Sequence, residues 1–126
     1  MPDKKYAIVI TPDGIVMTVS WNPENEFSKL QEYVGGYIEV APTELSSFCM
    51  VVNEEGKLLN LPLNGVASHI LPKAMQKFDC VCGNAVLMKR GREDLEPLTR
   101  AEVIRWKQII NEVCDVQDRK NPLEES

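Results

Sequence analysis

The side chains that could recognise a polar ligand are concentrated in one stretch of the sequence. Asparagine amides both donate and accept hydrogen bonds, and a lysine supplies the cation that an anionic ligand requires. Such residues recur between positions 53 and 69, and we expect them to form the rim of a ligand pocket in which Lys57 is the cation. They are Asn53, Lys57, Asn60, Asn64, Ser68 and His69.

A second candidate lies at Gly35–Gly36, which two tyrosines flank. Two interpretations are open. The glycines can end the preceding helix as a left-handed C-cap, or they can let the backbone approach a ligand closely. In the second case Tyr33 and Tyr37 would supply a stacking face. The pair lacks the glycine spacing of a nucleotide-binding loop.

Catalytic chemistry has little support in the sequence. His69 is the only histidine, and its neighbour Ser68 would point about 100° away from it on a helix, so the two do not form a nucleophile and its base. Glu54 and Glu55 occupy a predicted turn, where carboxylates are normally solvated. We therefore expect no catalytic residue and no cofactor. An enzyme would need His69 packed against a cysteine or an acid.

The four cysteines have poor spacing for a metal site. Structural zinc sites favour C-x2-C pairs, whereas Cys80 and Cys82 form a C-x-C pair and Cys49 and Cys114 are scattered. Alternate residues of a strand share a face, so we predict that Cys80 and Cys82 are neighbouring core-facing thiols. The expectation is no disulfide and no metal.

Charge and hydropathy narrow the classes of partner. The 126 residues carry a formal net charge of −5, which disfavours broad binding of duplex nucleic acid, because that binding needs an excess of lysine and arginine. No apolar run reaches the length of a membrane span, and no signal peptide is recognisable. We expect a cytoplasmic protein with one domain over residues 1–119 and a flexible tail over 120–126.

The first half of the chain predicts a hairpin, a helix and further strands. A Pro-Asp-Gly turn joins strands at 5–10 and 15–21. A helix should follow from a cap at Asn22 to Gly35, with Phe27, Leu30 and Val34 on its apolar face. Strands are expected at 37–40, ending before Ala41–Pro42, and at 48–52. A tight turn with a positive φ at Gly56 should then lead into a strand at 57–59.

The second half predicts two helices around one long strand. Asn64 should cap a short helix that ends at Pro72, and a strand should cover 79–89. Thr99 and Glu102 form a capping box, with Leu98 placed to pack on Val103. The apolar face of this last helix should be buried, and comprises Val103, Trp106, Ile109, Ile110 and Val113.

These elements predict an α+β fold. Because hairpins dominate, we expect a mixed, mostly antiparallel sheet with two or three helices packed on it. A short sheet of this kind leaves open edge strands, and symmetric pairing through an edge or through the last helix would cover them. A homo-oligomer is therefore expected.

Several motifs, in order and spacing, resemble one known family. They run from Tyr33 to Glu39, from Val52 to Leu58, from Leu61 to Asn64 and from Gly83 to Leu87. Over roughly residues 5–90 this pattern is similar to the family called domain of unknown function 3846, with the helix from Thr99 outside it. The family pattern usually has Gly-Asp where this chain has Gly83–Asn84, which argues against an acidic role there.

The resemblance implies a setting more than a mechanism. The family is typical of phages, plasmids and other mobile elements of bacteria, and it carries no known enzymatic activity. A small accessory protein acting in the bacterial cytoplasm is implied. The leading hypothesis is a non-catalytic protein that binds a small polar ligand, with sequestration of a nucleotide-type immune signal as its specific form.

A protein-interaction inhibitor is the rival hypothesis. It would block a host defence factor through the acidic surface or the last helix, and it should show a flat apolar patch containing an exposed Trp106 or Phe48. A ligand-binding protein should instead have a concave pocket that holds Lys57 and Asn64. An enzyme ranks third.

Overall fold

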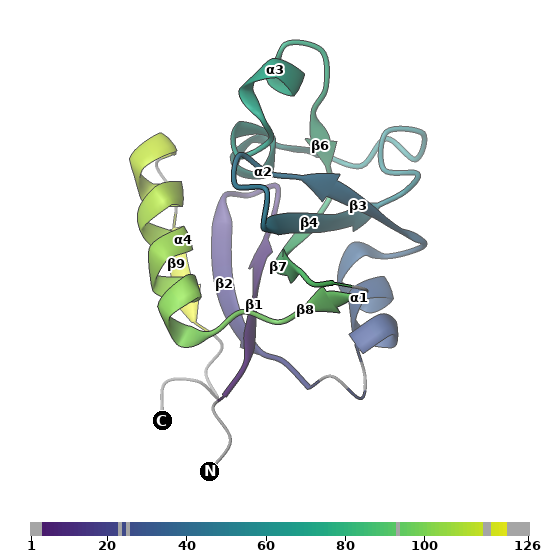
Figure 1. Ribbon diagram of the computed structural model, residues 1–126. Coiled ribbons are helices and arrows are strands. Elements are labelled where there is room, and N and C mark those ends of the chain that lie inside the picture. The colour runs from purple at the N-terminus through teal and green to yellow at the C-terminus, as the bar shows by residue number, and fades with distance from the viewer. Residues whose placement is uncertain (1–3, 23, 25, 93, 115–116, 121–126) are drawn as a thin grey trace.

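The chain folds as an α+β domain around one mostly antiparallel sheet (Figure 1). The computed structural model describes residues 4–22, 24, 26–92, 94–114 and 117–120. The sheet order is β3-β4-β7-β1-β2-β9, with β8 paired to β7, and only the β2–β9 pair is parallel. The strands are β1 Tyr6–Ile10, β2 Ile15–Ser20, β3 Ile38–Pro42, β4 Phe48–Asn53, β7 Ala85–Arg90, β8 Leu95–Glu96 and β9 Gln117–Lys120.

Helices cover both faces of this sheet. Helix α1 (Glu26–Val34) lies on one face, while α2 (Gly65–His69) and α4 (Arg100–Val113) lie on the other. The alternation of strand residues explains the division: Met50 and Leu87 point to the α2–α4 face, and Val51 and Val86 point to the α1 face. The predicted fold class is confirmed. None of the described helices is long and apolar enough to cross a membrane.

Helix α4 begins as its sequence predicts. The Thr99 hydroxyl accepts from the Glu102 amide at 3.2 Å, and the Glu102 carboxylate accepts from the Thr99 amide at 2.9 Å. Trp106 is buried, with 1% exposure, and its ring packs edge-on against that of Phe48, with the ring centroids 5.4 Å apart. Val113 was predicted to be buried with them, but it is half exposed because it lies in the last turn, beyond the edge of the core.

Helix α1 follows an Asn22 cap, whose Oδ1 accepts from the Glu24 amide at 3.1 Å. Leu30 and Val34 are buried against the sheet, as predicted. The prediction for Phe27 was wrong: this residue, in the first turn of the helix, is 62% exposed. Periodicity alone therefore overestimates the buried face of this helix.

The hairpin expected after β4 does not form. Residues 54–60 make consecutive turns, so the predicted strand at 57–59 was wrong. Gly56 does not have the predicted positive φ, and a Cβ there would lie 2.7 Å from the Cys82 carbonyl oxygen. Close backbone approach, rather than a left-handed conformation, is what this glycine provides. The residue with the positive φ is Asn60, at 56°.

The long strand expected at 79–89 is broken at Gly83, whose φ is 88°. Its first part, β6 (Val81–Cys82), pairs with β5 (Leu63–Asn64) in a separate two-stranded sheet, and only its second part, β7, joins the main sheet. A short helix, α3 (Lys73–Gln76), precedes β6 and was not predicted. Gly83 thus turns the chain at a point where the apolar run had predicted a continuous strand.

Two predicted boundaries, the end of β3 and the start of the C-terminal tail, differ from those in the structure. Strand β3 continues through Pro42 instead of ending before Ala41. Lys120, the first residue of the predicted tail, belongs to β9, and residues 121–126 lie outside the described part of the chain.

Candidate functional site

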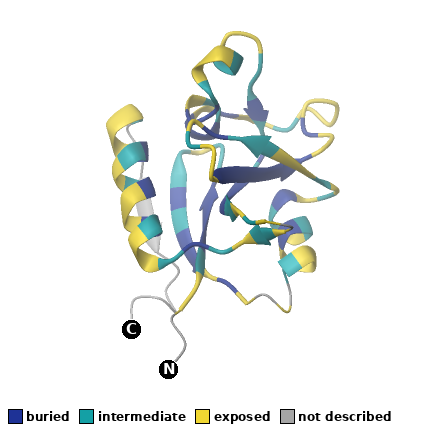
Figure 2. Cartoon of the chain, viewed as in Figure 1, coloured by how far each residue is buried: buried dark blue, intermediate teal, exposed yellow. Residues whose placement is uncertain are grey.

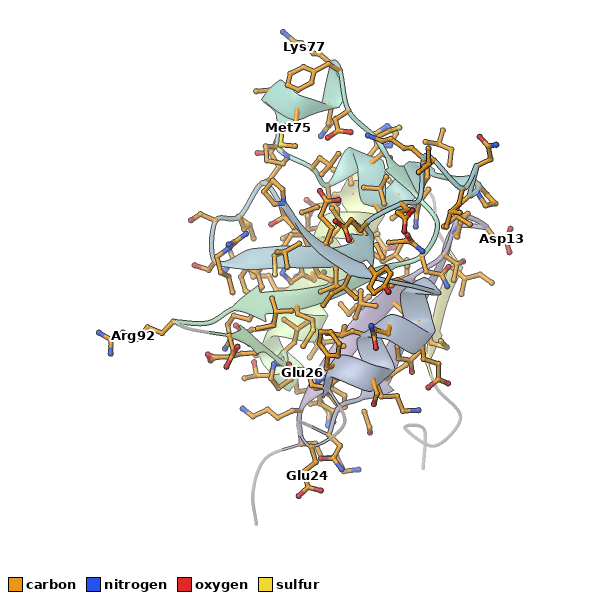
Figure 3. All side chains as sticks on the ribbon, turned by 90° about the vertical axis from the view of Figure 1, so that its right-hand side faces the viewer. Asp13, Glu24, Glu26, Met75, Lys77 and Arg92 are labelled. Carbon is orange, nitrogen blue, oxygen red and sulfur yellow. The ribbon has the colours of Figure 1, made fainter. Side chains whose placement is uncertain are left out.

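A groove runs along β3, between the sheet and the segment that carries α3 and β6. Its volume is about 330 Å³. Buried or half-buried apolar side chains line it, among them Ala41, Val52, Leu71 and Val81. In Figure 3 Met75, which also lines the groove, projects from α3 towards the sheet, whereas Lys77 points away from it. We call this feature the β3 groove.

Charged side chains surround the β3 groove. Four carboxylates and one ammonium line it: Glu39, Glu54, Glu55, Asp79 and Lys57. The ammonium and one carboxylate neutralise each other, because Lys57 Nζ donates to Asp79 Oδ1. This hydrogen bond raises the pKa of Lys57 above its ordinary value and lowers the pKa of Asp79. No salt bridge among the described residues involves the other three carboxylates, so the groove is acidic.

Two of the predicted ligand residues, Lys57 and Asn53, line the groove. Lys57 is the predicted cation, but its partner is Asp79. Asn53 is buried, and both ends of its amide bond within the protein: Nδ2 donates to the Val34 carbonyl at 3.0 Å, and Oδ1 accepts from the Glu55 amide at 2.7 Å. Asn53 therefore fixes the turn that carries the acids.

Asn64 and Ser68 lie outside the groove lining and hold the framework together. Asn64 is fully buried; its Nδ2 donates to the Ile10 and Gly83 carbonyls, both at 2.9 Å, and its Oδ1 accepts from the Ala67 amide at 3.0 Å. This confirms the predicted cap. The Ser68 hydroxyl donates to the Asn64 carbonyl and accepts from the Val81 amide, each within 2.8 Å. Asn64 was predicted to share a pocket with Lys57, but the lining of the β3 groove includes Lys57 and not Asn64.

The glycine pair proves to be a helix end. The Gly35 and Gly36 amides both donate to the Gln31 carbonyl, at 2.8 and 3.2 Å, and Gly35 has a φ of 78°. A Cβ on Gly36 would lie 3.0 Å from Asn53 Nδ2, so the close approach there is to a side chain of this protein. Of the two tyrosines that flank these glycines, Tyr33 stacks its ring on that of Trp21.

The remaining predicted residues are exposed and separate from the groove lining. Tyr37 is exposed beside β3, and Asn60 is exposed in the turn that follows Lys57. His69 is exposed, with Nδ1 2.7 Å from the Gly65 carbonyl oxygen. The groove lining contains thiols and carboxylates but no histidine, so His69, the residue that the enzyme hypothesis would pair with a cysteine or an acid, is not at this place.

Several groove residues were missed by sequence reasoning. Cys80 and Cys82 were predicted to be core-facing strand residues, but both are only half buried, because the break at Gly83 lifts β6 away from the main sheet. Burial raises the pKa of the Cys82 thiol. Asp79 also escaped notice, since its partner Lys57 is distant in sequence. The four cysteines are free, and no group of three potential metal ligands occurs among the described residues.

Comparison with known protein families decides the family. The sequence profile of a domain of unknown function, DUF3846, matches residues 4–111, which is most of the chain. The chain belongs to the DUF3846 family. The match runs past the expected limit at residue 90 and includes α4 almost to its end, so α4 is part of the DUF3846 domain.

Within the DUF3846 domain, Asn84 has a structural contact. Its Nδ2 donates to the Tyr33 carbonyl at 2.9 Å, which ties the start of β7 to the end of α1. Searches of curated proteins and of solved structures gave no significant match. The family assignment therefore adds no substrate or partner to what the geometry indicates.

Proposed function

We propose that this chain is a non-catalytic binding protein whose ligand site is the β3 groove. The observation that carries the proposal is the groove itself: its 330 Å³ falls within the range of small-ligand sites, with an apolar lining and charged groups around it. The family resemblance supports an accessory role for a phage or another mobile element, in the bacterial cytoplasm.

The charges around the groove favour a ligand with cationic or hydrogen-bond-donating groups. Glu39, Glu54 and Glu55 have no ionic partner among the described residues, and Lys57 is already paired with Asp79. A nucleotide-type immune signal, the specific form expected from the sequence, would have to displace Asp79 from Lys57 before its phosphate gained a cation.

A melting-temperature screen tests the proposal. The ligand set should contain nucleotides and cyclic dinucleotides together with cationic compounds such as spermidine and arginine. A ligand at 100 times its dissociation constant stabilises a protein by about 2.7 kcal/mol, which is readily seen. We expect at least one cationic compound to raise the melting temperature.

A groove-filling variant then locates the site. In Ala41→Phe the ring would occupy the groove that Ala41 lines, and the stabilisation should disappear. The matched control is Ala101→Phe, at an exposed position of α4. Stabilisation that persists in Ala41→Phe would contradict the placement of the ligand in this groove.

A protein-interaction role is the second candidate, and one observation favours it. Leu58, a large apolar residue of the groove lining, is 78% exposed, and Val40, whose side chain lies on the other face of β3, is 39% exposed. The patch expected from the sequence, with Trp106 or Phe48 exposed, is absent because both rings are buried. An interaction role would therefore use the β3 side of the molecule rather than the aromatic face of α4.

Assembly into a symmetric oligomer also remains part of the proposal. The edge position of β3 and the exposed Ile104 and Val113 of α4 support it, since either surface could pair with a second copy. Light scattering at micromolar protein concentration tests this expectation, and a monomeric mass would contradict it.

A further inference from the structure

We propose that the open edge of β3 and the adjoining groove take an extended, basic peptide segment of a partner protein as an added β-strand. The inference rests on the proposed binding role of the groove and names its ligand class. Three observations carry it: the position of β3 at the edge of the sheet, the direction of its unpaired backbone groups, and the acidic side chains along the same edge.

Strand β3 is the last strand of the described sheet on this side and pairs only with β4. Figure 2 shows the consequence: β4 is buried along its length, whereas β3 beside it is partly or fully exposed. An edge strand of this kind presents backbone donors and acceptors that another strand can use.

The register shows which backbone groups are available. The Glu54 amide donates to the carbonyl of Tyr37, the residue directly opposite it, at 2.9 Å. Hydrogen-bonded pairs alternate along an antiparallel ladder, so Glu39 and Ala41 also bond to β4. The N–H and C=O groups of Ile38 and Val40 therefore point to the open edge.

The end of β3 fits the same alternation. Pro42 stands at the next outward-facing position, where its missing N–H removes no bond to β4. A strand added at this edge would thus bond to both groups of Ile38 and of Val40, and to the Pro42 carbonyl.

Side-chain alternation determines what the added strand would meet. Glu39 and Ala41 share a face with Val52 and Met50, their partners on β4, and this is the face of the groove. Every second side chain of an added strand would point over the same face. It would there approach Glu39 and the other unpaired carboxylates around the groove.

Charge complementarity then selects the partner. Lysine or arginine at alternate positions would place cations along the carboxylates of Glu39, Glu54 and Glu55. The intervening side chains would lie on the face of Val40 and can be apolar. The predicted ligand is an extended segment in which basic and apolar residues alternate.

The test uses a set of octapeptides with lysine or arginine at every second position and valine, isoleucine or leucine between. Binding to the full-length protein is measured by fluorescence anisotropy. The best-binding peptide is then made in two N-methylated forms, one with methyl groups on the amides of its basic residues and one with them on the apolar residues. Strand addition directs only alternate amides at β3, so one form should bind at least about tenfold more weakly while the other keeps its affinity.

The identity of the weakened form gives the strand direction. Loss on methylating the apolar residues indicates antiparallel addition, because those residues would exchange bonds with Val40. Loss on methylating the basic residues indicates parallel addition. Equal effects in the two forms, or no binding by any peptide of the set, would overturn the inference.

Protein variants test the other side of the contact. Val40→Pro removes the outward N–H and should lower the affinity for the peptide about tenfold. Circular dichroism should show that the sheet is intact in this variant. Glu39→Gln should lower the affinity about threefold, as expected for the loss of one exposed ion pair. Glu112→Gln on α4 is the control and should leave the affinity unchanged. An unchanged affinity in both Val40→Pro and Glu39→Gln would refute the site.

Three further outcomes decide between this inference, a second copy of the chain at the edge, and the proposed function. If Val40→Pro converts a dimer to a monomer in sedimentation, a second copy occupies the edge and the peptide inference fails. If no peptide binds but a small ligand is lost in Ala41→Phe, the groove remains the ligand site and only the peptide inference fails. If peptides bind with strand register while Ala41→Phe has no effect on any ligand, the groove assignment fails.

Discussion

The polar residues around Asn64 and those along the β3 groove form two regions with opposite properties. Around Asn64 the side-chain amide is fully buried and its hydrogen bonds are made to three different backbone segments. Along the β3 groove the carboxylates of Glu39, Glu54 and Glu55 are exposed and have no ionic partner among the described residues. Side chains of similar polarity thus serve as framework in one region and are available to a ligand in the other.

This contrast gives a rule for reading such clusters. A buried polar group must find its partners within the protein, because leaving it unpaired costs more than the bond itself contributes. An exposed one has water as a partner and can exchange it for a ligand. Substitutions in the framework should therefore change stability without changing ligand binding, and substitutions at the groove should do the reverse.

The largest expected effect is at the framework residue Trp106. Trp106→Ala should lower the free energy of unfolding by about 3–5 kcal/mol, because it leaves a cavity beside Phe48 on the α4 face. Urea denaturation measures the change, and Ile104→Ala, on the exposed side of the same helix, is the control. Equal midpoints for the two variants would show that the α4 face is not part of the core.

Asn64→Ala should have the next largest effect. It removes the cap of α2 and leaves the Ile10 and Gly83 carbonyls without this donor, which we expect to cost about 3 kcal/mol. The control is Asn60→Gly, since Asn60 is exposed and its positive φ suits glycine. If Asn64→Ala retained full stability but lost ligand binding, the division between framework and groove would be reversed.

A smaller, pH-dependent effect is expected at Glu102. Burial raises the pKa of this carboxyl, but hydrogen bonds from Thr99 and Lys89 outweigh that effect and hold it below the ordinary 4.5. A group with a lowered pKa in the folded state stabilises the protein above pH 4.5, and this contribution is lost as the pH falls through the folded value. We expect a contribution under about 1 kcal/mol.

Urea denaturation between pH 3 and pH 7 checks this prediction. Part of the acid-induced loss of stability should disappear in Glu102→Gln, which cannot ionise. Glu112→Gln, also on α4, is the matched control. An identical pH dependence in wild type and Glu102→Gln would contradict the assignment.

The smallest effect on stability is expected at Lys57. Lys57→Ala breaks an exposed ion pair and should cost under about 1 kcal/mol. Its effect on binding has a diagnostic sign: the groove becomes more acidic, so a basic ligand should bind a few-fold more tightly, whereas an anionic nucleotide should bind more weakly. Calorimetric titration distinguishes these outcomes. Weaker binding of a basic ligand to Lys57→Ala than to wild type would contradict the assignment of an acidic groove.

Local sequence signals predicted the elements with the clearest chemistry. The capping box at Thr99, the Asn64 cap and the hairpin of β1 and β2 depend on residues close together in sequence, and all three are present. The α+β class followed from them. The break at Gly83 was missed because an apolar run conceals it, and it separates β6 from the main sheet.

The groove could not be predicted in the same way, because it depends on contacts between distant segments. Asp79 meets Lys57 only after α3 and β6 fold back over β3. The outward direction of Val40 depends on the β3–β4 register, which a single sequence does not show. Polar composition identified Asn53 and Lys57 as groove residues, but it could not separate them from Asn64.

The central claim, that ligands bind along β3 and not at the framework, is tested most directly by nuclear magnetic resonance. The ¹⁵N-labelled protein is titrated with the best-binding basic octapeptide, and amide shifts are followed residue by residue. The account predicts the largest chemical-shift changes at the amides of Ile38, Val40 and residues 54–58, and no change at the amides of α4. The largest shifts at α4, or at the side-chain amide of Asn64, would contradict it.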